Sequence, residues 1–234
     1  MAASPAVVHL ILALFTTLFT SGSSIQIEWA GRTWNVRDTK GTLSGPGPNY
    51  FSDSPEHVTV DSRGNLRLQV TNTSGKWVCG ELSLPRSLGY GTYEWTVTSD
   101  AGYLENNVIL GLFTYAMNPE QNHREIDIEF GRFGLSPARD PTNAQFRWYA
   151  PPVSASSPPL VVSFTWTPGR IDWEARQAEL LLSSKTYAAG DVPTPGPELT
   201  VINLWVYKSR GITGPINGKG ATVYLSDFIF TPCY

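Results

Sequence analysis

The most constraining feature of the chain is the pentapeptide Glu-Ile-Asp-Ile-Glu that begins at Glu125. Successive side chains of a β-strand point to opposite faces of a sheet. A strand here therefore places Glu125, Asp127 and Glu129 on one face, and it places Ile126 and Ile128 on the other face, toward a core. Carboxylates that share a face repel each other and gain nothing for folding. The pattern thus predicts a strand whose acidic face is kept for chemistry.

The rest of the chain reads as many short strands separated by Gly and Pro, with almost no helical periodicity after residue 24. Such spacing is typical of a sandwich or barrel. No loop is long enough for a domain linker, so we expect residues 25–234 to form one all-β domain. The expected strands are Leu66–Thr71, Trp77–Leu84, Tyr90–Thr98, Val108–Tyr115, Arg124–Phe130, Gln145–Tyr149, Leu160–Trp166, Arg170–Glu174, Glu179–Leu182, Thr200–Val206 and Ala221–Phe230.

Composition narrows the function classes. Of the 234 residues, 41% are hydrophobic and only 16% are charged, which favours a packed core over disorder. The net charge of −3 and the absence of a basic run disfavour a nucleic-acid partner, which requires a positive surface. Most of the 8 Trp, 10 Tyr and 10 Phe residues are expected in the core, and the remainder could stack on flat ligand faces such as sugars.

The N-terminal 24 residues resemble a secretory signal peptide. Residues 6–20 form an apolar block, and the small residues Ser21–Ser24 follow it. The block is short for a membrane span. No Lys or Arg precedes it, so an uncleaved membrane anchor is the alternative. We expect a secreted protein, extracellular or in a cell wall, without membrane contact after cleavage.

Two further features fit export. Asn72-Thr73-Ser74 is a glycosylation sequon. Cys79 and Cys233 are the only cysteines, and an isolated pair often forms a disulfide in an oxidising compartment; two free thiols are the alternative. No Cys or His cluster has the spacing of a zinc site.

The spacing of the acids sets a geometric condition. Residues four apart in an extended strand, such as Glu125 and Glu129, have Cα atoms roughly 13 Å apart. Retaining glycosidases use two carboxyl groups of unlike proton affinity that lie only about 5–5.5 Å apart. Two long side chains leaning inward on a concave strand can close that gap, with the shorter Asp127 between them. The pattern therefore predicts a curved sheet with the acids on its concave side.

At these residues the chain resembles glycoside hydrolase family 16, whose strand motif is Glu-x-Asp-x-Glu. Within that family it is most similar to the bacterial 1,3-1,4-β-glucanases (lichenases), with the xyloglucan-modifying branch as a neighbour. The resemblance spans about Asn49 to Pro232. The stretches that carry it, besides the motif, are Cys79–Glu81, Gly89–Glu94, Leu112–Tyr115, Gln145–Tyr149, Phe164–Pro168, Ile171–Trp173 and Asn203–Trp205.

The resemblance implies a concanavalin A-like β-jelly-roll of two curved antiparallel sheets. It also implies that Glu125 is the nucleophile, that Asp127 assists it, and that Glu129 is the general acid and later the base. With Glu125 ionised, repulsion should raise the pKa of Glu129 and keep that residue protonated.

Other roles follow from the resemblance alone. No cofactor is expected to be needed for catalysis, although Asp227 resembles a position that helps to bind structural calcium. Each expected substrate contact could equally be structural. These contacts are Asn49, Phe51, Glu81, Tyr149 and Trp205.

The chain departs from the lichenase pattern beside the motif. His123 and Arg124 replace a Trp and an Asp, and Arg147 replaces an Asn. Strand alternation points Arg124 away from the cleft and allows His123 to face it. These differences leave the substrate open. We expect a monomeric retaining endo-β-glycosidase acting on a linear polysaccharide, most simply a β-1,3- or β-1,3-1,4-glucan. The alternatives are a xyloglucan-type transglycosylase and a non-catalytic carbohydrate-binding module.

Overall fold

A computed structural model of the chain describes residues 25–135, 142–144, 150–151, 153, 157–208 and 214–233. Its elements are β1 (Gln26–Trp29), β2 (Arg32–Val36), β3 (Tyr50–Phe51), β4 (Val58–Val60), β5 (Leu66–Thr73), β6 (Lys76–Ser83), β7 (Gly91–Val97), η1 (Ala101–Tyr103), β8 (Val108–Tyr115), η2 (Asn122–Arg124), β9 (Ile126–Phe130), β10 (Leu160–Thr167), β11 (Arg170–Gln177), β12 (Leu180–Ala188), β13 (Leu199–Val206) and β14 (Ala221–Pro232).

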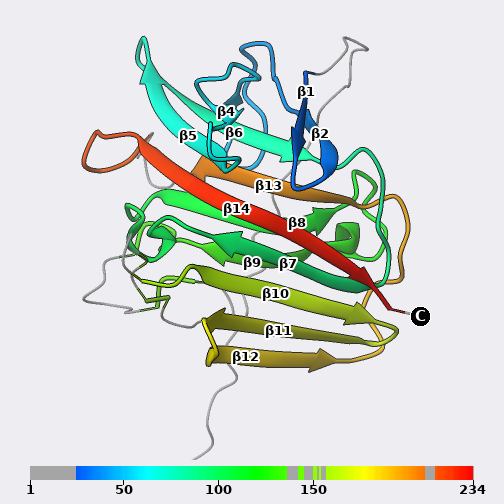
Figure 1. The fold of residues 1–234 in the computed structure, drawn as a ribbon. Coiled ribbons are helices and arrows are strands. Elements are labelled where there is room, and N and C mark those ends of the chain that lie inside the picture. Colours follow the sequence, from blue (N-terminus) through cyan, green and yellow to red (C-terminus); the bar gives the residue numbers. More distant parts are fainter. Residues whose placement is uncertain are drawn as a thin grey trace, which may run out of the picture.

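The strands form one antiparallel path that curls into two layers (Figure 1). Its order is β12-β11-β10-β7-β14-β5-β6-β13-β8-β9. Strand β6 joins the layers, because Lys76–Val78 pairs with β5 and Gly80–Ser83 pairs with β13. Strands near the two ends of this order contact each other. The indole N–H of Trp173 in β11 donates to the backbone carbonyl of Asp127 in β9, at 3.0 Å. This curled sheet confirms the expected jelly-roll fold.

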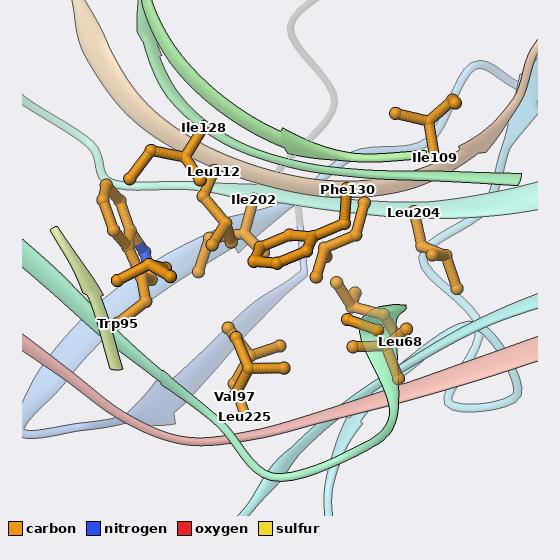
Figure 2. Packing of buried hydrophobic residues seen from close by; sticks show 14 of the residues in the cluster. Leu68, Trp95, Val97, Ile109, Leu112, Ile128, Phe130, Ile202, Leu204 and Leu225 are labelled. Atoms are coloured by element: carbon orange, nitrogen blue, oxygen red, sulfur yellow. The ribbon is translucent and has the colours of Figure 1, made fainter. Parts of the chain in front are cut away.

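The hydrophobic core lies between the two layers. Ile126 and Ile128 are 2% and 0% exposed, which confirms the apolar face predicted for this strand. In Figure 2 the strands drawn above the core are curved, and their concave side faces away from the core. The side chain of Ile109 points to this concave side. The labelled side chains that point into the core are Leu112, Ile128, Phe130, Ile202 and Leu204 from one layer and Leu68, Trp95, Val97 and Leu225 from the other.

The ends of several strands differ from the sequence prediction. The strand expected from Arg124 begins only at Ile126, because the residues before Glu125 form a left-handed turn. The strand predicted at Glu179–Leu182 is β12, which runs to Ala188 and is therefore longer than expected. Strands β1 to β4 were not predicted. The strand predicted at Gln145–Tyr149 and the signal segment 1–24 lie outside the described residues.

The expected disulfide is not formed. Cys79 is fully buried in β6, whereas Cys233 is exposed after β14, and both are free thiols. Burial raises the pKa of Cys79 to about 12, so this thiol stays protonated and unreactive. Asn72 is exposed at the end of β5, as a glycosylation site requires. The part of the chain that the structure describes contains no helix with the length and apolar character needed to cross a bilayer.

Replacing Ile128 by Ala tests the apolar side of β9. The side chain is 0% exposed, so the change should lower the free energy of unfolding by about 2–5 kcal/mol, through lost burial and a cavity. Urea unfolding followed by circular dichroism measures this loss. Ile229→Ala in β14 is the matched control, because Ile229 is 48% exposed and its removal should change stability by less than about 0.5 kcal/mol. Equal losses in both variants would contradict the assignment of faces.

Candidate active site

The three acids lie on the face of β9 that is opposite the core, which we call the acid face. Asp127 and Glu129 are half-buried and pair in register with Phe113 and Gly111 of β8. Glu125 directly precedes β9 and is exposed. The alternation of buried isoleucines with solvent-accessible acids confirms the two-faced strand predicted from the sequence. Register extends this face across β8, β13 and β6.

The carboxylates of the acid face interact strongly. Burial, followed by the charge of Glu129, raises the pKa of Glu125 to about 7. Glu125 keeps some solvent contact, but the protein around it limits the hydration of its charge. Burial, followed by the charge of Glu125, also raises the pKa of Asp127 well above its usual range. The set therefore retains protons near neutral pH. The raised pKa expected for Glu129 stays a prediction.

A polar row crosses the acid face beside Glu129. Gly111, Asn203 and Glu81 follow one another in register on β8, β13 and β6. The Asn203 amide donates to Glu81 Oε2 at 3.1 Å, and Arg37 donates to Glu81 Oε1 at 2.8 Å. A Cβ on Gly111 would lie 2.5 Å from Asn203 Oδ1, so only glycine leaves room for this row. The row places hydrogen-bonding groups beside the acids.

Asn203 and Arg37 belong to the polar row but were not singled out from the sequence. Asn203 is 1% exposed, and its Oδ1 has no hydrogen-bond partner within the described residues. A buried acceptor of this kind is costly unless another group donates to it. The only sequence signal for Asn203 was its place beside Trp205 in a stretch that carried the resemblance, and Arg37 gave none.

An apolar surface lies on the same face, beside Glu125 and Asp127. Phe113, Tyr115 and Val201 form a buried cluster separate from the main core. The imidazole of His123 stacks on the ring of Tyr115, with centroids 4.8 Å apart and an interplanar angle of 11°. Burial and then the charge of Glu125 raise the pKa of Tyr115 to about 12, so its phenol stays neutral. His123 thus reaches the site, as the sequence allowed, by stacking on Tyr115.

Two predicted substrate contacts lie at β3, with Asn49 directly before the strand and Phe51 at its end. Asn49 is fully buried, and its Nδ2 donates to the carbonyls of Pro46 at 2.7 Å and Val206 at 2.9 Å. Phe51 is 1% exposed, with the guanidinium of Arg37 above its ring at 4.4 Å. Both side chains are buried in this way, and their direct contact with a substrate stays a prediction.

Three predicted substrate contacts remain, namely Glu81, Trp205 and Tyr149. Glu81 belongs to the polar row described above. Trp205 is 7% exposed and packs edge-on against Phe133 and Tyr207, at centroid distances of 6.4 and 6.3 Å. These three aromatic rings border the acid face, because Trp205 shares a face of β13 with Asn203. Tyr149 lies outside the described residues, as does Arg147.

Asp227, the position that the resemblance connects with structural calcium, lies in β14. Its Oδ1 accepts the backbone N–H of Phe228 at 2.9 Å, beside an irregularity in the pairing of β14 with β7. Within the described residues, no group of three His, Cys, Asp or Glu side chains is placed to hold a metal ion. Because calcium also takes backbone carbonyls and water as ligands, the calcium role of Asp227 stays a prediction.

The turn before Glu125 is left-handed throughout. Gln121, Asn122, His123 and Arg124 have φ angles of 50°, 52°, 61° and 50°. Such a conformation costs a residue other than glycine about 1–2 kcal/mol. Arg124, at the end of this turn, is 7% exposed and hydrogen-bonds to neighbouring loops. Strained backbone of this kind is more frequent at functional sites than elsewhere in proteins.

Comparison with known proteins supports the fold. No protein-family profile matches the chain, and no curated protein matches it. Among solved structures, a β-glucanase of Bacillus licheniformis aligns with a TM-score of 0.60 at 20% identity, covering 92% of this chain and 100% of that one. A LamA variant of Zobellia galactanivorans in complex with laminaritriose and laminaritetraose aligns with a TM-score of 0.54 at 12% identity, covering 93% and 100%.

A third similar structure is a Mycobacterium tuberculosis protein described as an immunostimulatory antigen and pseudo β-1,3-glucanase. It aligns with a TM-score of 0.57 at 18% identity, covering 86% of this chain and 91% of that one. Together these structures confirm, at the level of the fold, the resemblance to glycoside hydrolase family 16. At such identities they show the fold alone.

The pKa of Glu125 predicts how one variant changes stability. The native state holds this proton more tightly than the unfolded chain, so the wild type loses stability as the pH rises from about 4.5 to about 7. Glu125→Gln removes that loss. The variant should therefore gain unfolding free energy relative to the wild type between pH 4 and pH 8, as measured by urea unfolding at each pH. A pH-independent difference would contradict the raised pKa.

Proposed function

We propose that the protein is a retaining endo-β-glycosidase that hydrolyses a β-1,3- or β-1,3-1,4-glucan. The observation that carries the proposal is the coupled set of Glu125, Asp127 and Glu129 on the open face of β9. Two carboxyl groups that share a proton can supply both the acid and the nucleophile of glycoside hydrolysis. The β-glucanases of the same fold and the laminarioligosaccharide complex of LamA support the substrate class.

In the proposed reaction, Glu125 attacks the anomeric carbon while Glu129 gives its proton to the departing glycosidic oxygen. The product of this step is a covalent glycosyl-enzyme. Glu129 then takes a proton from water, whose oxygen displaces Glu125 and restores the starting protonation state. Asp127 lies between the two glutamates in sequence and tunes the charge of Glu125, since their charges interact. Two successive inversions retain the anomeric configuration.

The remaining groups of the acid face fit a bound glucan chain. Asn203, Glu81 and Arg37 would hydrogen-bond sugar hydroxyls, and the apolar surface at Tyr115 and His123 would cover a sugar ring face. Stacking of flat rings against sugars combines apolar burial with polar edges. The chemistry needs no cofactor in this scheme. We also propose that the protein is secreted after removal of residues 1–24 and acts as a monomer outside the cell or in a cell wall.

Removing either glutamate tests the proposed roles. Glu125→Gln and Glu129→Gln should each lower kcat by about 10²–10⁴-fold on the glucan that the wild type cleaves best. Reducing-end release is the measurement. Glu179→Gln is the matched control, because Glu179 is exposed between β11 and β12 and should leave kcat unchanged. Full activity in Glu125→Gln would disprove the nucleophile assignment.

Sizing the products from a panel of β-glucans, xyloglucan and β-galactans separates the alternatives. Short products from β-1,3- or β-1,3-1,4-glucan support the proposal. Products longer than the starting oligomers would indicate transglycosylation. Binding of glucan without release of reducing ends would indicate a carbohydrate-binding module, the outcome that the pseudo-glucanase of the same fold makes worth testing.

The coupled acids also predict the pH dependence of catalysis. The active state has one proton shared between Glu125 and Glu129, so kcat/KM should follow a bell-shaped profile. The alkaline limb should fall near the pKa of about 7 given for Glu125, where the two glutamates lose their shared proton. Initial rates from pH 3 to pH 10 measure both limbs. Activity that stays flat up to pH 9 would be inconsistent with a shared proton.

A further inference from the structure

We propose that Arg124 is a positioning residue, whose buried side chain holds the left-handed turn that directs Glu125 onto the acid face. The inference rests on the proposed role of Glu125 as the nucleophile. It concerns a residue at which this chain departs from the pattern of similar glucanases, and which strand alternation had directed away from the cleft.

The guanidinium of Arg124 ties two loops together. Its Nε donates to the backbone carbonyl of Thr194 at 3.0 Å, and its Nη1 donates to Asn118 Oδ1 at 3.3 Å. Its Nη2 pairs with Glu120 Oε2 at 3.4 Å. The side chain is 8% exposed, so these bonds are largely protected from water. Arg124 therefore connects the loop before β9 with the loop before β13.

The fit of this guanidinium depends on Gly196. A Cβ on Gly196 would lie 2.5 Å from Arg124 Nε and 2.8 Å from its Cζ. The backbone of the 190–197 loop therefore packs directly against the guanidinium. A methyl group at this position would displace Arg124 without altering Arg124 itself.

A second contact joins the same two loops. Gln121 Nε2 donates to Thr194 Oγ1 at 3.0 Å, and the Thr194 amide donates to Gln121 Oε1 at 2.6 Å. Thr194 is thus bound by the first and the last residues of the left-handed turn. Four successive left-handed residues other than glycine persist only where surrounding contacts hold them.

The peptide bond between Arg124 and Glu125 is fixed on both sides. Thr114 Oγ1 donates to the Arg124 carbonyl at 2.9 Å, and the Glu125 amide donates to the Asn122 carbonyl at 3.2 Å. These bonds set the direction in which the Glu125 side chain leaves the backbone. The contacts of the guanidinium itself go to the two loops and none is to Glu125, so Arg124 acts through geometry.

Two variants loosen the same contact from opposite sides. Arg124→Lys keeps the charge but cannot donate to Thr194, Asn118 and Glu120 together, since an ammonium lacks the planar fork of a guanidinium. Gly196→Ala pushes the guanidinium away. Each variant should lower kcat about 10- to 100-fold, with KM within about threefold and an unchanged pH profile, because misplacement of a reacting group costs rate. Arg176→Lys is the control, since Arg176 forms an exposed ion pair with Glu174 and should keep full kcat.

Hydrogen exchange of the Arg124 and Glu125 amides provides a readout that needs no activity. Both amides donate within the turn, to Gln121 at 3.0 Å and Asn122 at 3.2 Å. Both variants should exchange at these amides at least about tenfold faster than the wild type while the Ile128 amide is unchanged.

The outcomes separate the two proposals. A wild type inactive on every polysaccharide refutes the proposed function, and faster exchange in the variants would still support the anchoring role of Arg124. Unchanged exchange in both variants overturns the inference, as does unchanged kcat despite faster exchange, or a shifted pH profile. If Arg124→Lys fails to fold by near-ultraviolet circular dichroism, Gly196→Ala alone decides.

Discussion

The site depends on a conflict within one short strand, in which burial on one face holds repelling charges together on the other. Ile126 and Ile128 are almost fully buried, and each contributes about 1.5–3 kcal/mol by leaving water. The same backbone fixes Asp127 and Glu129 on the opposite face beside Glu125. There burial, and then the charge of a neighbouring glutamate, raises the pKa of Glu125 and of Asp127. The core thus stabilises an arrangement that the acids alone would disrupt.

Strand register then decides what surrounds the acids. Gly111 lies opposite Glu129 on one side and Asn203 on the other, so the absence of a side chain at one position leaves space for a buried amide at the next. Glu81 and Arg37 complete the row through charge-assisted hydrogen bonds. Because the row is bonded internally, it is preorganised before any ligand binds, which lowers the cost of ordering on binding. A site built in this way favours an extended polar ligand that lies across several strands.

Loop contacts, rather than strand pairing, orient Glu125. Glu125 lies just outside β9, so strand pairing alone does not orient it. The left-handed turn and the contacts of Arg124 with the Thr194 loop replace that pairing. In this arrangement the most exposed acid of the set follows four successive left-handed residues. Strained backbone is a recurring property of functional sites.

The sequence by itself determined the features that rest on local periodicity. The alternation at Glu125 to Glu129 correctly predicted a two-faced strand, and the frequent Gly and Pro residues predicted an all-β fold, because side-chain direction in a strand repeats every two residues. Glu81, which the resemblance marked as a substrate contact, lies in the polar row, and its contact with a substrate stays a prediction. None of these inferences required knowledge of which strands pair.

Only the tertiary structure decided the features that depend on distant segments. The turn at Arg124 was predicted as strand because its cause, the Thr194 loop, is 70 residues away in the chain. Asn203 and Gly111 joined the site through register, and Cys79 was separated from Cys233 by burial in the core. Local pattern fixes which way a side chain points, whereas the identity of its neighbours is set by chain folding and long-range packing.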